Sequence, residues 1–72
     1  MFAVYGKRTE TIWYPSRRIS QGPDKTFRAL DAHGERVTVK ANAITFETRE
    51  AAQEWIDKHK WHKGVIVEIR KF

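Results

Sequence analysis

The sequence predicts an α+β domain: a mainly antiparallel sheet of four to five strands in the order β-β-β-β-α-β, with one helix packed on one face. Three observations predict it. Side chains alternate in the manner of a strand near both ends of the chain, at 2–7 and 65–70. Two β-prone runs, 26–31 and 35–40, flank a short turn that ends in glycine. Apolar residues over 51–59 follow helical spacing.

Two strands are expected before residue 15. Residues 2–7 alternate as a half-buried strand does. Residues 12–14, Ile-Trp-Tyr, are β-prone, and Pro15 ends this run or places it at a sheet edge because proline has no N–H to donate. The Ser, Gly, Pro and Asp residues of 16–24 then predict a loop.

The clearest expected hairpin pairs 26–31 with 35–40. Its loop is 32–34, Ala-His-Gly, and Gly34 occupies the last position, where a left-handed backbone is needed. A two-residue loop is less favourable, because its register mixes apolar and charged side chains on each face. The predicted register sets Phe27 opposite Val39 and Ala29 opposite Val37, so that these four side chains face the core.

The helix is expected to open within 46–50, with Thr48 as N-cap and Glu50 near the positive helix start. One helix face is defined by Ala51, Ala52, Trp55, Ile56 and His59. Gly64 ends the helix or the connection that follows it. In the last strand, Val65, Val67 and Ile69 alternate with Ile66, Glu68 and Arg70.

The expected core packs Trp55 and Ile56 of the helix against apolar strand residues. These are Phe27, Val37, Val39, Val65 and Val67. An alternative arrangement closes the first four strands partially into a small SH3-like barrel. Residues 1–72 are expected to form a single domain, because a core needs most of a chain this short and no repeat or linker is present.

Composition indicates a soluble, basic protein. The chain is 40% hydrophobic and 32% charged, and its longest apolar run, 65–67, is far shorter than a membrane span. The N-terminus has no signal-peptide pattern. No cysteine is present, which is compatible with the reducing cytoplasm where we place the protein. The net charge of +5 and the pI of about 9.9 suggest an anionic partner, although such a charge also serves solubility.

Residues for catalysis or metal binding are hard to find in the sequence. The three histidines, His33, His59 and His62, form no HExxH arrangement and have no cysteine beside them. Ser16 and Ser20 lack the context of a nucleophile, and four scattered glycines form no phosphate-binding loop. We therefore expect no enzyme activity, no metal, no cofactor and no small-molecule substrate.

Basic and aromatic residues form the most suggestive constellation. Residues 1–44 carry eight basic and four acidic side chains, whereas 45–72 carry six and five, so the positive charge is concentrated in the sheet-forming part. Arginine and lysine contact phosphates, and exposed aromatic rings stack on bases. The predicted binding residues are Lys7, Arg8, Trp13, Tyr14, Arg17, Arg18, Arg28, Arg36, Lys40 and Trp61.

The predicted fold gives several of these residues an expected placement, and for Trp61 it leaves a packing role open beside a binding role. Arg28, Arg36 and Lys40 are expected to project from the outward face of the hairpin. Trp13 and Tyr14 are adjacent on a strand and so point to opposite faces, which leaves one of them partly exposed. Trp61 either closes the helix end against the sheet or acts as an anchor for a partner.

The composition therefore favours a small regulatory protein that binds an anionic macromolecule and no membrane. The partner is nucleic acid or a nucleic-acid-handling complex such as a transcription machinery. The alternative is a protein–protein inhibitor that contacts an acidic protein surface through an aromatic and arginine hot spot, as a phage host-takeover or anti-defence factor does.

Residues 37–72 resemble small bacteriophage regulatory proteins built from a sheet and one helix. The likeness consists of a strand, Glu47-Thr48, a helix with Glu50-Ala51 and Trp55, and then Gly64 before a final strand that ends in basic residues. In pattern it is similar to the phage T7 inhibitor of host RNA polymerase. The resemblance implies a small regulatory or inhibitory protein, and it carries over no functional residue.

Overall fold

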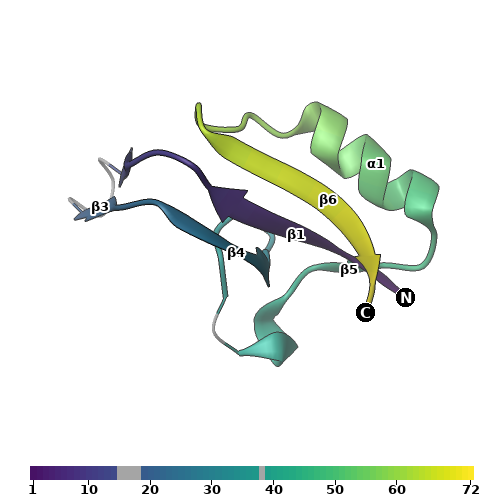
Figure 1. The fold of residues 1–72 in the computed structure, drawn as a ribbon. Helices are drawn as coiled ribbons and strands as arrows, with labels where there is room; N and C mark the ends of the chain where they lie inside the picture. The colour runs from purple at the N-terminus through teal and green to yellow at the C-terminus, as the bar shows by residue number, and fades with distance from the viewer. Residues whose placement is uncertain (15–18, 38) are drawn as a thin grey trace.

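The computed structural model describes residues 1–14, 19–37 and 39–72, with only the backbone of Tyr14 and Ile19 (Figure 1). The described residues form an antiparallel sheet, a separate two-stranded ribbon and one α-helix, which confirms the predicted α+β class. In order the elements are β1 Phe2–Arg8, β2 Ile12–Tyr14, β3 Ile19–Gln21, β4 Asp24–Ala29, the 3₁₀ helix η1 Lys40–Asn42, β5 Thr45–Phe46, α1 Arg49–Lys58 and β6 Val65–Lys71.

Strand β1 lies at the centre of the main sheet. β6 pairs antiparallel along its whole length, from Phe2 opposite Lys71 to Arg8 opposite Val65. The other edge of β1 is shared, because β4 pairs with its C-terminal half and β5 with its first residues, both antiparallel. The described strands therefore form an open sheet with β1 inside, and the barrel alternative is wrong.

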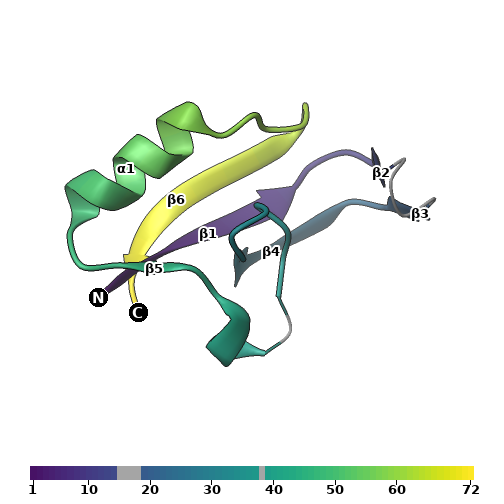
Figure 2. The ribbon, with the colours of Figure 1, turned by 180° about the vertical axis from the view of Figure 1, so that it is seen from behind.

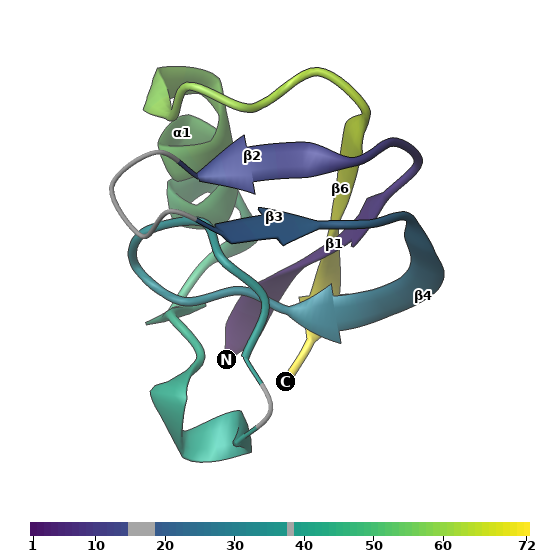
Figure 3. The same cartoon turned by 90° about the vertical axis from the view of Figure 1, so that its left-hand side faces the viewer.

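Strands β2 and β3 form a ribbon that continues β1 and β4 beyond the sheet (Figure 3). Trp13 pairs with Ser20, and Ile12 is buried at the base of this ribbon. The prediction of a loop over 16–24 is therefore wrong for its last residues, since 19–21 form β3 and β4 begins at Asp24. Residues 15–18 lie outside the described part of the chain.

The predicted hairpin forms only at its turn. Gly34 has the expected left-handed backbone, with φ of +79°. Leu30 and Arg36 make a single bridge in the predicted register, and the Val37 N–H donates to the Ala29 carbonyl at 3.0 Å. The expected strand over 35–40 is absent from its described residues, because β4 takes β1 as its long partner instead.

The helix begins as predicted. The Thr48 side chain accepts a hydrogen bond from the Ala51 N–H at 3.1 Å, which satisfies one of the unpaired donors of the first turn. α1 contacts β1, β5 and β6, and its Ala52 is fully buried. Ala51, expected on the buried face, is exposed. The helix ends at Lys58, and Gly64, with φ of +87°, turns the chain into β6.

The core lies between α1 and the sheet, where Val4 and Leu30 pack with Ala52. Partly buried side chains surround these three: Phe46, Trp55, Ile56, Trp61, Val67 and Ile69. Figure 2 shows α1 and the segment after β4, which crosses over the strands. The expected core therefore needs two corrections. Val39 is 54% exposed, and Phe27 packs with side chains on the opposite side of the sheet.

No helix in the described part of the chain is long and apolar enough to cross a membrane.

Candidate functional site

One face of the main sheet has no described element packed on it. In Figure 3, α1 and the described segments 30–37 and 39–44 lie on the same side of β1 and β6. We call the other side the open face. Its larger side chains come from three strands and are Tyr5, Lys7, Phe27, Ile66, Glu68 and Arg70, while Ala3 and Ala29 share this face and are buried.

The period of a strand explains which side chains lie there. Val4 of β1 is in the core, so its neighbour Tyr5 points the other way. Ile69 of β6 also packs against the core, so Arg70 points to the open face. Because Tyr5 is opposite Glu68 in the ladder, these residues are brought together from opposite ends of the sequence.

Cations and aromatic rings are paired on the open face. The Arg70 guanidinium carbon lies 5.1 Å from the centre of the Tyr5 ring and 5.0 Å from that of Phe27. The Lys7 ammonium lies 4.9 Å from the centre of the Phe27 ring. These distances are within the range of cation–π attraction. Glu68 accepts a hydrogen bond from Nε of Arg70, and this bond also helps to orient the Arg70 guanidinium group.

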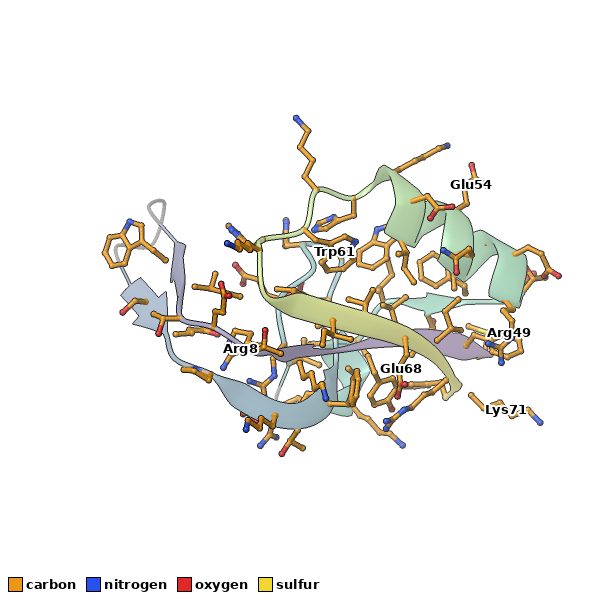
Figure 4. All side chains as sticks on the ribbon, turned by 45° about the horizontal axis from the view of Figure 1, so that its top comes forward. Arg8, Arg49, Glu54, Trp61, Glu68 and Lys71 are labelled. Atoms are coloured by element: carbon orange, nitrogen blue, oxygen red, sulfur yellow. The ribbon has the colours of Figure 1, made fainter. Side chains whose placement is uncertain are left out.

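The open face remains accessible. The Arg70 side chain is 48% exposed, and Ile66 is among the most exposed large apolar residues. Lys25, two residues before Phe27 on β4, is exposed as well. By contrast, α1 carries two basic and three acidic side chains and is slightly negative. Figure 4 shows one of these acids, Glu54, pointing away from the sheet. The positive and aromatic surface is therefore on the side opposite the helix.

The predicted basic residues are dispersed. Lys7 lies on the open face, and Arg8, at the end of β1, donates from Nε to the Gly22 carbonyl at 3.0 Å. Arg28 on β4 is half exposed, with its Nε 3.9 Å from the Asp24 carboxylate. Lys40 lies at the start of η1, where its ammonium is 5.2 Å from the centre of the Phe72 ring.

Arg36 does not project into solvent as expected. Its side chain is only 10% exposed and binds the Asp24 carboxylate at 2.5 Å. The Thr26 N–H also donates to Asp24, and these two hydrogen bonds lower the pKa of Asp24 from 3.8 to about 2. Arg36 therefore ties the segment after the turn to β4, and it belongs to the structure rather than to a docking surface.

The predicted aromatic anchor on the ribbon is exposed. Trp13 is 52% exposed on β2, in agreement with the expectation that one of the two adjacent rings faces solvent. The side chain of Tyr14 lies outside the described part of the structure, and so do Arg17 and Arg18.

Trp61 closes the helix end, which was one of its two expected roles. Its Nε1 donates to the Ile56 carbonyl at 3.1 Å, and its ring meets Trp55 edge-on at 5.5 Å. Figure 4 shows it beside the end of α1. It is also partly exposed to a polar cleft of about 250 Å³, which is lined by His33, Gly34, Glu35, His59, Lys60, Trp61, His62 and Val65.

The histidines around this cleft do not form a metal site. Within the described ranges, no three His, Cys, Asp or Glu side chains are placed to hold a metal ion. His59 instead packs between two rings, 5.1 Å from Trp55 and 4.3 Å from Trp61. It therefore contributes to packing at the helix end.

Of the residues of the open face, Lys7 was predicted as a binding residue, and the missed ones include Tyr5, Phe27 and Arg70, which form its ring–cation pairs. Phe27 was placed in the core because the expected hairpin was the wrong pairing. The alternation of the first and last strands contained the signal for Tyr5 and Arg70. Using that signal requires knowing that these two strands are neighbours, which only the fold reveals.

Comparison with protein-family models, with curated proteins and with solved structures finds no match to this chain.

Proposed function

We propose that this chain is a small non-enzymatic regulatory protein that binds nucleic acid, alone or within a nucleic-acid-handling complex, through the open face. One observation carries the proposal. Two aromatic rings on an uncovered sheet face, those of Tyr5 and Phe27, are paired with the cations of Lys7 and Arg70. Such cations attract phosphates, and rings beside them offer surfaces for bases.

The charge distribution supports this choice of face. The net charge is +5, while α1 on the opposite side is slightly negative. A polyanion is therefore attracted toward the strands and repelled by the helix. The resemblance of the C-terminal half to small phage regulators is consistent with a regulatory role.

The test measures binding of labelled oligonucleotides by fluorescence anisotropy at several salt concentrations. If phosphates dominate the contact, log affinity falls linearly with log salt, with a slope of about −0.7 per phosphate on single strands and about −0.9 on duplex DNA. Replacing both Lys7 and Arg70 by glutamine removes two cations of the open face. We expect weaker binding and a salt slope that is smaller by about one or two phosphate contacts.

The matched control replaces Lys58 and Lys63 by glutamine, which changes the net charge equally. Lys58 is exposed on α1, where it pairs with Glu54 at 2.6 Å, and Lys63 is exposed in the turn before β6. Equal losses in both double variants would show general attraction without a defined face. No binding of any oligonucleotide at low salt would refute the proposal.

A protein partner is the second candidate, and the exposed Trp13 favours it. Tryptophan is enriched at the hot spots of protein interfaces, and here it stands on a ribbon that extends from the sheet. In that case Trp13→Ala abolishes capture of one partner from a cell extract, while binding of oligonucleotides is absent. The chain then acts as a protein–protein inhibitor.

A further inference from the structure

One guanidinium group, that of Arg70, contacts both rings of the open face. Arg70 is centred about equally far from Tyr5 and Phe27, at 5.1 and 5.0 Å, and Glu68 holds its Nε. Bases stack on aromatic rings and also on the planes of arginine side chains. The face therefore brings two aromatic rings and one guanidinium plane from three strands next to one another, with the Lys7 ammonium beside them.

Only unpaired bases can use such surfaces. In a duplex the faces of the bases are already stacked on their neighbours, and a protein reaches the base edges with an element that enters a groove. The open face cannot reach base faces that are stacked in a duplex, and its strands do not protrude as an element that enters a groove does. It lies on a sheet, and the only α-helix in the described ranges carries three acidic and two basic side chains, so its slightly negative charge does not favour insertion into a major groove.

From this arrangement we infer that the open face binds single-stranded nucleic acid and prefers it to duplex. The inference rests on the proposed function and narrows its ligand. Bases stack on Tyr5, Phe27 and the Arg70 plane, while Lys7 and Arg70 contact phosphates. Because every base has a π-face, binding is tolerant of sequence.

Within the described part of the chain, the β2–β3 ribbon is the element that competes for duplex DNA. A two-stranded ribbon fits a major groove, and Trp13 is exposed on it. Duplex binding through the ribbon depends on Trp13 and not on Tyr5 or Phe27. The two modes therefore make opposite predictions for substitutions.

The experiment compares three labelled ligands on the unchanged full chain. They are a 12-nucleotide single strand of mixed sequence, the same sequence as a duplex, and an abasic strand of equal length that keeps only sugars and phosphates. We expect the single strand to bind at least tenfold more tightly than the abasic strand, because stacking contributes about 1–3 kcal/mol per base. We also expect it to bind more tightly than the duplex.

Substitutions then locate the contact. Tyr5→Leu and Phe27→Leu keep an apolar side chain but remove the ring, and each should weaken binding of the single strand about 5- to 10-fold. Binding of the abasic strand should not change, which separates lost stacking from a general structural effect. Trp13→Leu, on the ribbon, is the control. Circular dichroism melting shows whether each variant is folded, and the comparison of ligands on the unchanged chain decides the question if a variant is not.

Equal affinity for the abasic and the base-bearing strand overturns the stacking inference but leaves nucleic-acid binding in place. If the duplex binds more tightly than the single strand and Trp13→Leu abolishes this duplex binding, the inference is overturned and the β2–β3 ribbon is the contact. Failure to bind all three ligands at low salt overturns the proposed function as well.

Discussion

Gly34 and His59 meet where the turn after β4 touches the end of α1. A Cβ atom at Gly34 would lie 2.9 Å from Cε1 of His59 and closer still to its Nε2, so no larger residue fits without movement. The imidazole cannot yield easily, because its ring is held between Trp55 and Trp61. The turn and the helix end are thus fitted to each other.

Gly34→Ala should therefore destabilise the fold by about 1–3 kcal/mol. The alanine is strained at φ of +79°, and its methyl group overpacks the contact with His59. Urea unfolding measures the loss. Gly22→Ala is the matched control, since a Cβ there meets nothing within 4 Å, and its stability should be unchanged or slightly raised. Equal stability of the two variants would contradict the close contact.

The tryptophans at positions 55 and 13 differ in their surroundings, which allows a second prediction. Trp55 packs on Phe46, His59 and Trp61 with ring centres 5.1 to 5.9 Å apart, whereas Trp13 is 52% exposed. Trp55→Ala should cost about 3 kcal/mol, a large part of the stability of so small a domain. Trp13→Ala should stay within about 0.5 kcal/mol of the wild type. Thermal unfolding of both variants checks this, and an unchanged melting temperature for Trp55→Ala would disprove the packing.

Features set by neighbouring residues were predictable from the sequence. The Thr48 cap was predictable because its hydroxyl precedes by three residues the Ala51 N–H from which it accepts a hydrogen bond. The left-handed backbone of Gly34 was predictable from its place at the end of a three-residue loop. The register of Leu30 with Arg36 is correct for the same reason. Each of these depends on fewer than ten residues of chain, where local stereochemistry decides the outcome.

Features that depend on distant pairing were not predictable. β4 could pair either with residues 35–40 after the turn or with β1. Pairing with β1 is favoured because β1 then has a hydrogen-bonded partner on both edges. β3 was missed because Ile19-Ser20-Gln21 has little β-propensity of its own and forms by pairing with β2. The open face was missed as a unit for the same reason, since Tyr5 and Arg70 are neighbours only after β1 and β6 pair.

Asp24 makes stability depend on pH in acid. Its pKa falls from 3.8 to about 2 because the Thr26 N–H and Arg36 donate to the charged carboxylate. A group whose pKa is lower in the folded state stabilises the fold above its unfolded pKa, and this contribution is lost as pH falls from about 4 to about 2. Asp24→Asn should therefore flatten the decline of stability across this window.

The control for this prediction is Asp57→Asn. The Asp57 carboxylate accepts a hydrogen bond from the Gln53 side-chain amide at 2.9 Å on the exposed side of α1. Urea unfolding at pH 2, 3, 4 and 6 gives the slopes. The same slope in Asp24→Asn as in the wild type would show that the pairing of Asp24 contributes nothing in acid.

Arg28 and Arg36 were expected to act alike on one outward face, and the structure separates them. Both approach Asp24, but the Arg28 side chain is half exposed at 3.9 Å, whereas that of Arg36 is 10% exposed at 2.5 Å. Arg36→Ala should lower the melting temperature clearly, because it removes the close partner of the Asp24 carboxylate and also leaves an unfilled space beside β4. Arg28→Ala should leave the melting temperature nearly unchanged and weaken oligonucleotide binding only through the loss of one surface charge.

Measuring both properties in both variants tests this division of roles. Arg36→Lys is the informative third variant, since it keeps the charge but loses the planar group that fits a carboxylate. We expect it to recover stability only in part. A normally stable Arg36→Ala protein with greatly reduced oligonucleotide binding would return Arg36 to the docking surface, where its sequence context first placed it.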